Sequence, residues 1–556
     1  MGRRVLFRGG HVYSPADPFA TALLLDGDAV AWVGSDGAAL AHADGVDEVV
    51  ELDGALVAPA FVDAHVHATA TGLALTGLDL RSAGSPGELL DAVAAAAAAS
   101  PGETVFGAGW DGTAWGVPVP TPAELDRATG GGWCYLAHAD GHSALVSTPL
   151  LAAVRKSAEA AGDRTGGLAA GRGSADGAAV VTGAAHDVAR RLALDSISPA
   201  ARAAAQRATR ARAAAVGIGC LHELAGPHLA GQDDLVALQR LAAQEPGPAV
   251  IAYWAQLHAV DTARQLGAVG AGGELVVDGS LDSGTAWLRA PYADRPGSGL
   301  PRLDAPELAA HLVACTRAGL QGGASAVGDA AVDLVVAALQ LAAAEVGTAA
   351  IRAARHRLEH ADLIRPEQLA TLVDLGVMVC VQPAADARWG GPGGMYEQRL
   401  GADRAAATHP LALLSARGTG LALSSAAPVT PLDPWAAVRA AAFHHNPAHR
   451  ISVRAAFAAH TRGGWRAARR DDAGVLVPGA AATLAVWAVE DLVVQAPDER
   501  IATWSTDARS GTPGLPDLTP GAPEPQCLLT VVDGDVAYVD PRLRRGPGVH
   551  EDRTRP

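Results

Sequence analysis

The chain has 556 residues, of which 49% are hydrophobic and 18% charged, and its formal net charge is −16. This composition excludes a disordered chain, and the acidic balance argues against a nucleic-acid groove, which needs a basic face. The length excludes a single small core and suits a barrel of about 250 residues or more, enlarged by insertions and joined to a smaller domain.

The sequence favours a cytoplasmic location. It has no run of about 18 uncharged apolar residues, so we expect no membrane span. The basic residues Arg3 and Arg4 are not followed by the apolar core of a signal peptide. The five cysteines are scattered and odd in number, which is typical of buried thiols in a reducing compartment. We therefore expect neither a membrane nor a nucleic acid as a partner.

Short strands are predicted at both ends of the chain. Residues 1–57 include the strand-like runs 5–10 and 29–34, with a turn at Leu25-Asp26-Gly27-Asp28. Residues 474–545 have the same character and include a predicted hairpin around Asp533-Gly534.

Between these ends, apolar strands alternate with alanine-rich helices, which indicates a βα repeat. Residues 88–99 and 202–215 are predicted helices, because alanine loses little entropy on entering a helix. Residues 217–223 are a predicted barrel strand. The segments predicted as insertions over the barrel mouth are 150–200 and 290–304, and 505–525 is a predicted loop.

His65-Val66-His67 is the most informative motif of the chain. It ends the apolar run 55–64, which predicts a buried strand. Because residues i and i+2 of a strand share a face, both imidazoles should point the same way. Such a pair either begins a divalent-metal site or consists of two ordinary histidines on a half-buried strand.

Nine phrases along the chain carry a family resemblance. The first is Pro59-Ala60-Phe61-Val62-Asp63-Ala64-His65-Val66-His67. The others, in order, are Gly109-Trp110-Asp111, Pro122-Ala123-Glu124-Leu125-Asp126, Ala139-Asp140-Gly141-His142-Ser143-Ala144-Leu145-Val146, Asp278-Gly279-Ser280-Leu281, Gly328-Asp329-Ala330, His356-Arg357-Leu358-Glu359-His360, Val381-Gln382-Pro383 and Ala427-Pro428-Val429-Thr430-Pro431-Leu432-Asp433-Pro434. Together they resemble family 3 of the amidohydrolase superfamily, which includes N-substituted formamide deformylase-like metal-dependent hydrolases.

The resemblance implies an α/β fold, a TIM (β/α)8 barrel with its chemistry at the C-terminal ends of the strands. The barrel would occupy residues 58–473. Residues 1–57 and 474–545 would meet in one composite β-sandwich beside it.

The resemblance also implies a metal site. The family takes an HxH from strand 1, an anionic bridge from strand 4, one histidine each from strands 5 and 6, and an aspartate from strand 8. His65, His67 and His360 match the histidines of strands 1 and 6. Glu274 stands where the family often has a lysine able to become a carbamate; it is either a bridging carboxylate or a solvated glutamate. These four residues would hold one divalent metal, for which we expect zinc.

Two positions depart from the family pattern. Ser325 replaces the strand-5 histidine, and Ala426 replaces the strand-8 aspartate. Serine is a poor zinc ligand, and alanine can neither bind a metal nor take a proton. A hydrolase would then need a substitute base, and the candidates are Asp329, Asp63, His142 and His222, of which we select Asp329 and His142 as catalytic residues.

Other polar residues receive supporting roles. Asp278 is predicted to hold the strand-4 loop. Gln382 is either a pocket residue, as in the family, or a capping or core amide. His409 and the pair His444-His445 lack ligand spacing and are predicted to lie at the surface.

The sequence therefore predicts a metal-dependent hydrolase that cleaves a non-peptide C–N bond of an amide or formamide-like small molecule through a metal-bound water. The alternative is a catalytically silent binding or scaffold protein on the same barrel, because Ser325 and Ala426 remove two site residues. The sequence leaves open the substrate and the oligomeric state, for which a homodimer is the commonest form.

Overall fold

The computed structural model describes residues 2–547 apart from 43, 114, 140, 161–179, 496–503 and 506–512. Its centre is a sheet of eight parallel strands in the order β19-β18-β17-β16-β15-β14-β13-β7. The sheet closes where Val66 pairs with Ala427 and the His67 N–H donates to the Ala427 carbonyl at 3.0 Å. The predicted TIM barrel is confirmed. Its strands are β7 (Phe61–Val66), β13 (Ile218–Ala225), β14 (Ala249–Trp254), β15 (Gly270–Ala271), β16 (Gln321–Ala326), β17 (Arg357–His360), β18 (Met378–Val381) and β19 (Gly420–Leu423).

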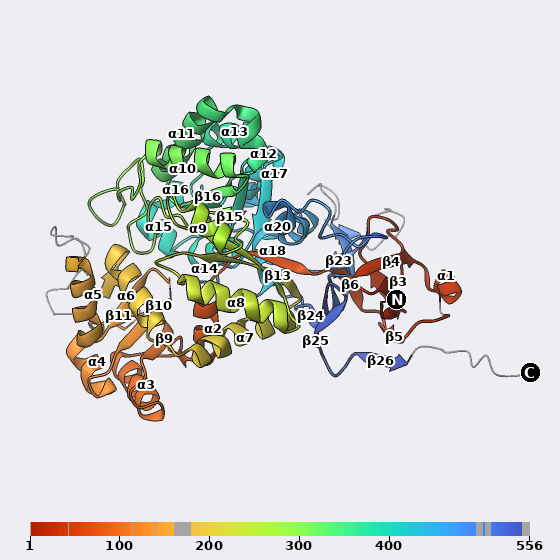
Figure 1. The fold of residues 1–556 in the computed structure, drawn as a ribbon, viewed down its shortest axis with the longest axis horizontal. Helices are drawn as coiled ribbons and strands as arrows, with labels where there is room; N and C mark the ends of the chain where they lie inside the picture. Colours follow the sequence, from red (N-terminus) through yellow and green to blue (C-terminus); the bar gives the residue numbers. More distant parts are fainter. Residues whose placement is uncertain are drawn as a thin grey trace, which may run out of the picture.

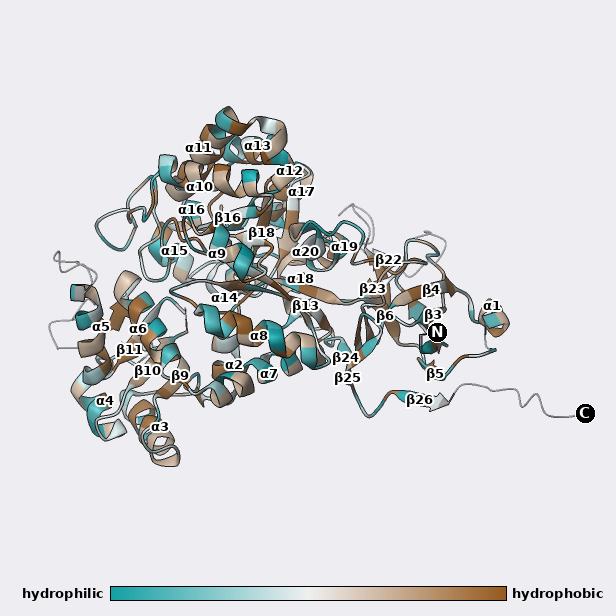
Figure 2. Cartoon of the chain, viewed as in Figure 1, coloured by the Kyte–Doolittle hydropathy of each residue, from teal (hydrophilic) through white to brown (hydrophobic). Residues whose placement is uncertain are grey.

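Helices surround this sheet, as Figure 1 shows. The predicted helices 88–99 and 202–215 lie within α3 (Pro86–Ala99) and α7 (Pro199–Ala215). Each begins with a serine cap followed by proline, which removes a donor that the first turn cannot satisfy. Figure 2 shows mainly hydrophobic strands at the barrel centre and mixed hydropathy on α7 and α8 (Gln232–Gln244), as expected of helices with one buried face.

A small β domain joins the two ends of the chain at one side of the barrel (Figure 1). It has two sheets, ordered β26-β5-β1-β3-β4 and β2-β6-β20-β24-β25, and both pair N-terminal with C-terminal strands. The predicted turns at 25–28 and Asp533-Gly534 lie where β3 connects to β4 and β24 to β25. The strands are β1 (Arg4–Arg8), β2 (His11–Val12), β3 (Ala22–Asp26), β4 (Ala29–Gly34), β5 (Glu48–Glu51), β6 (Leu56–Pro59), β20 (Leu484–Ala488), β24 (Gln526–Val532), β25 (Asp535–Val539) and β26 (Arg544–Pro547).

A large insertion separates the first two barrel strands. It forms a sheet in the order β12-β11-β10-β9-β8, covered by helices, and it includes α6 (Gly183–Asp195). The insertion begins at Leu78, well before the predicted segment 150–200, of which 161–179 lie outside the described residues. The strands are β8 (Leu78–Asp79), β9 (Val105–Trp110), β10 (Cys134–His138), β11 (Ser143–Val146) and β12 (Val180–Thr182).

No single helix in the described part of the chain is long and apolar enough to cross a bilayer. One pair, α11 (Asp329–Val346) and α12 (Thr348–Ala354), meets the length and composition test together, but it is bent by 119°.

Candidate metal centre

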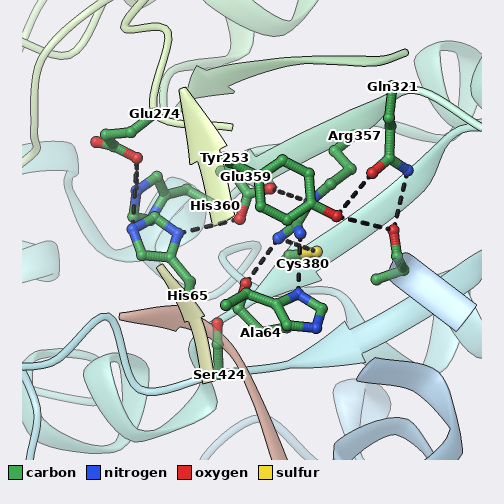
Figure 3. Close-up of polar contacts among 12 residues, drawn as sticks. Ala64, His65, Tyr253, Glu274, Gln321, Arg357, Glu359, His360, Cys380 and Ser424 are labelled. Carbon is green, nitrogen blue, oxygen red and sulfur yellow. Dashed lines mark hydrogen bonds and ion pairs between the residues drawn. The ribbon is translucent and has the colours of Figure 1, made fainter. Parts of the chain in front are cut away.

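Three potential ligands converge at the barrel mouth (Figure 3). Ligand atoms of His65, Glu274 and His360 all lie within 4.8 Å of one another. Glu274 Oε2 is 3.4 Å from His65 Nε2 and 3.7 Å from His360 Nε2. Four ligands arranged tetrahedrally at zinc bond lengths of about 2.0–2.1 Å would lie about 3.3 Å apart. The spacing of these atoms therefore suits a shared cation.

Two glycines place Glu274. β15 ends at Ala271, and Gly272 and Gly273 follow with φ of 134° and 86°, which favour glycine. A Cβ at Gly272 would lie 2.4 Å from the backbone of Gly323 in the next strand, so no larger residue fits. The chain then brings Glu274 over the barrel mouth with its side chain 9% exposed. This burial disfavours the solvated alternative.

His65 is oriented from behind by a buried carboxylate. Its Nδ1 lies 3.0 Å from Oε2 of Glu359, a residue that is fully buried. A carboxylate only accepts, so the proton sits on Nδ1 and the Nε2 lone pair faces Glu274. Such outer partners fix the tautomer of metal-binding histidines.

His360 is oriented in the same manner by an amide. Its Nδ1 lies 2.8 Å from Gln382 Oε1, and Gln382 Nε2 donates to Ser424 Oγ at 3.0 Å. This amide orientation places a proton on Nδ1, so in the neutral ring, the form that binds a metal, the Nε2 lone pair faces Glu274. Gln382 is therefore a positioning residue for His360.

His67 completes the group from strand 1. Its ring centroid lies 5.3 Å from that of His65, and it lines the adjoining cavity. Its Nδ1 is buried and has no hydrogen-bond partner among the described residues. A lone pair left in this way suits a metal ligand, because a buried unpaired acceptor is otherwise costly.

The electrostatics of the centre suit a cation. Burial lowers the pKa of His67 to about 3, and the charge of His65 adds to this effect, so His67 is neutral. Burial works to raise the pKa of Glu274, but the contact with His360 and the positive charge that His65 and His360 can carry lower it below its usual value. A neutral imidazole and an ionised carboxylate are the forms that bind divalent metals.

A charged network lies below the centre, inside the barrel (Figure 3). The Arg357 Nε donates to Glu359 Oε1 at 2.8 Å, and both side chains are fully buried. Arg357 also donates to the Ala64 carbonyl at 2.7 Å and packs its guanidinium over the Tyr253 ring at 4.4 Å. No functional role was predicted for Arg357 or Glu359 from the sequence. The available signal was a pair of opposite charges at i and i+2 within the phrase that ends at His360.

A cavity of about 1140 Å³, including its opening to solvent, adjoins the centre. His67, Glu274 and His360 line it, together with His142 and Ser325. Ala426 lines a smaller neighbouring cavity that also contacts His360 and His142. The two substituted positions therefore both face the space around the candidate ligands.

Asp329 is placed away from this cavity lining. It is the first residue of α11, where its carboxylate accepts from the Arg289 N–H at 2.9 Å and from Arg365 Nη2 at 2.6 Å. The structure does not bring it to the candidate ligands. These contacts tie the segment after strand 4 and the loop after strand 6 to the start of α11.

Asp63 and His222, the other candidate bases, are held inside the barrel. Asp63 accepts from the backbone N–H groups of His65 and Ser425. His222 Nδ1 lies 3.0 Å from Arg357 Nη1, which can only donate. Of the four candidate bases, His142 is the one that lines the cavity.

Asp278 holds the strand-4 loop, as predicted. Its carboxylate accepts from the backbone N–H groups of Trp287, Val327 and Gly328 at 2.8–3.0 Å. These bonds tie the loop after strand 4 to the loop after strand 5.

A model of the amidohydrolase family matches residues 48–538. The chain belongs to the amidohydrolase family. It is 28% identical over 499 residues to Protein LONG AFTER FAR-RED 3 of Arabidopsis thaliana, and the match covers 83% of each chain. It is 26% identical over 425 residues to Putative amidohydrolase YtcJ of Bacillus subtilis, covering 71% of this chain and 74% of that one.

Solved structures support the same assignment. An uncharacterized metal-dependent hydrolase from Pyrococcus furiosus superposes with a TM-score of 0.67 at 25% identity, covering 86% of this amidohydrolase and 97% of that chain. A second one, from Pyrococcus horikoshii, gives a TM-score of 0.68 at 23% identity and shows the shared fold. The family and the converging ligand atoms together support a divalent metal at the centre.

The prediction that His409 and His444 lie at the surface of this amidohydrolase is wrong. Their exposed fractions are 1% and 3%, because both face the buried carboxylate of Asp386. Asp386, His444 and His445 also bring ligand atoms within 4.8 Å of one another. However, the Asn446 N–H donates to His444 Nδ1 at 3.0 Å, so the His444 proton sits on Nε2 and points toward Asp386. This second group is therefore a network of histidines around a buried carboxylate rather than a metal site.

His409 should make stability depend on pH. It lies between Asp362 and Asp386, at 3.2 and 3.4 Å. Burial works to lower its pKa, but the charge of Asp362 and hydrogen bonds to both carboxylates raise it to about 10. The unfolded value is about 6.5, so the stabilisation is fully present below about pH 6.5 and is lost as pH rises toward 10.

We expect His409→Gln to lower the free energy of unfolding by a few kcal/mol near pH 6, and this difference should shrink steadily up to about pH 10. Urea unfolding across this range measures it, with the exposed His11→Gln as the control. A difference that stays constant with pH would contradict a charged His409.

Proposed function

We propose that this amidohydrolase hydrolyses a non-peptide C–N bond of an amide or formamide-like small molecule, with one zinc ion held by His65, His67, Glu274 and His360. The observation that carries the proposal is the convergence of His65, Glu274 and His360, with His67 lining the adjoining cavity. In both His65 and His360, Nδ1 lies within hydrogen-bond distance of another side chain, and Nε2 faces Glu274. Neutral imidazoles with one carboxylate are the ligands of catalytic zinc sites.

Two residues of the cavity wall, His142 and Ser325, can take part in the reaction beside the metal. A zinc ion at this centre supplies polarisation of a carbonyl and a lowered pKa for a coordinated water. His142 lines both cavities beside His360, and we assign it the proton transfer that the family's strand-8 aspartate performs. The Ser325 side chain lines the cavity and offers a hydroxyl that can donate to the substrate carbonyl.

The second candidate function is a catalytically silent binding protein. It is favoured by the loss of a histidine and an aspartate at Ser325 and Ala426, both of which face the cavities. Glu359 and Gln382 argue for the hydrolase, because they orient the rings of His65 and His360. A protein without a metal or activity would have no need of this orientation.

Metal analysis tests the proposal. We expect purified wild-type protein, incubated with zinc and desalted, to hold close to one equivalent, and His65→Ala to hold less than roughly a tenth. His11→Ala, in the small β domain, is the matched control and should behave as wild type. Hydrolysis of a panel of N-formyl and N-acyl amines should be lost with the metal. A wild-type protein that holds less than a tenth of an equivalent would overturn the metal centre.

We also propose a cytoplasmic location and a small-molecule substrate. The location is supported by five buried free cysteines, and the substrate class by the cavity beside the ligands. Assembly as a homodimer stays a prediction.

A further inference from the structure

The wall of the main cavity contains a charged group that the proposed hydrolysis does not use. Asp187 and Arg190 lie on α6, and Arg302 lies in the segment between β15 and α10 (Ala305–Ala318). Arg302 Nη1 donates to Asp187 Oδ2 at 2.7 Å, and Arg190 Nη2 is 3.5 Å from Asp187 Oδ1. All three residues line the same cavity as His67 and Glu274.

The group has an excess of positive charge. Two guanidiniums face one carboxylate, and their side chains are 19% and 34% exposed, against 20% for Asp187. Arg190 also donates through Nε to the His228 carbonyl at 3.2 Å. Among the described residues, Arg190 Nη1 and Arg302 Nη2 have no hydrogen-bond partner, so both have donors left for a ligand.

The rest of the cavity wall is largely apolar. Leu73, Phe106, Leu194 and Leu229 line it, together with small alanines. A molecule that reaches both the candidate ligands and the arginines therefore needs an apolar body.

We infer that this cavity binds an amphipathic monocarboxylate, with Arg190 and Arg302 holding the carboxylate and the apolar wall holding its body. Arginine binds carboxylates through paired N–H groups, which suits a planar anion. Asp187 leaves the group a net charge of plus one, which one carboxylate neutralises, whereas a dianion such as a phosphate ester would leave a negative charge uncompensated in a largely apolar cavity. If the proposed function holds, the hydrolysed C–N bond lies at the opposite end of this molecule.

Calorimetry with phenylbutanoate and its methyl ketone analogue tests the inference. The two ligands have similar size, and the ketone has neither a charge nor a hydrolysable bond. We expect wild-type protein to bind the carboxylate at least about tenfold more tightly than the ketone, as a charge-assisted hydrogen bond implies. Arg190→Gln and Arg302→Gln should each remove most of this preference. Arg191→Gln is the matched control, because Arg191 is on the same helix but pairs with Asp195 at 3.3 Å.

Two further variants make the outcome decisive. Asp187→Asn should tighten carboxylate binding severalfold, which a destabilised protein would not do. The metal-free His65→Ala protein should keep the preference for the carboxylate, so the result does not depend on hydrolysis. The inference would be overturned if wild-type protein bound the two ligands equally well. It would also be overturned if only His65→Ala lost the preference for the carboxylate, since the carboxylate would then be bound by the metal and not by the arginines.

Discussion

Replacing Arg357 with methionine is expected to destabilise the protein by about 3–5 kcal/mol, because it leaves the Glu359 carboxylate buried without its counter-ion. Both side chains are fully buried, and the pair is joined at 2.8 Å. Arg357 also satisfies the Ala64 carbonyl at 2.7 Å, so the variant leaves a second buried acceptor unpaired. Urea unfolding, followed by circular dichroism, measures the loss.

A double variant separates stability from metal binding. Arg357→Met with Glu359→Leu removes both charges, and replacing a buried pair with apolar residues is often close to neutral. We therefore expect the double variant to recover most of the lost stability. It should still bind zinc about 10–100-fold more weakly, because His65 Nδ1 loses its carboxylate partner. A single variant that loses less than about 1 kcal/mol would show that Glu359 is not charged in the folded protein.

The barrel was predictable because its sequence signals are local. Residues 217–223 form most of β13, and the alanine-rich segment 202–215 falls inside α7 behind a serine cap. The start of the insertion was not predictable in this way. Its first strand, β8, is two residues long and is defined by pairing with β9 across α3, so no local period marks it.

The candidate site was predictable only in part. The HxH motif and family order located His65, His67, Glu274 and His360, and three of these four converge within 4.8 Å. Strand alternation alone would send Glu359 and His360 to opposite faces. His360 instead adopts φ of 67°, rare for a residue other than glycine, and this turns its ring toward Glu274. Such backbone strain at the end of a strand has no sequence signature and is typical of functional sites.

The buried His409 was missed for a related reason. Spacing along the chain shows no partner for it, and histidines without partners usually lie in water. Its partners, Asp362 and Asp386, follow strands 6 and 7, and the parallel barrel brings these strand ends together. Only the tertiary fold supplies the two carboxylates that make its burial favourable.

Restoring the family residues, by Ser325→His together with Ala426→Asp, is expected to raise the zinc content toward two equivalents and to lower turnover about 10²-fold. The new imidazole would stand beside Glu274, since both positions line the main cavity. The backbone accepts the second change, because Ala426 has φ of 50°, which aspartate tolerates better than most residues. We expect turnover to fall because the new histidine would occupy space that the substrate needs. A substrate displaced by about 1 Å from its reactive position can react about 10²-fold more slowly.

The contrast between the two candidate functions rests on the same double variant. Ser325→Leu with Ala426→Asn is the matched control, since it adds similar volume without the histidine ligand or the proton acceptor. An adapted hydrolase should lose turnover in both double variants, and only the histidine–aspartate version should gain metal. A silent protein would give the opposite result. Wild-type protein would have no turnover, and Ser325→His with Ala426→Asp would raise the rate about 10²–10⁴-fold over background, because the aspartate restores a proton acceptor. That gain would overturn the proposed hydrolysis while leaving the barrel, the ion pair beneath it and the converging ligands unchanged.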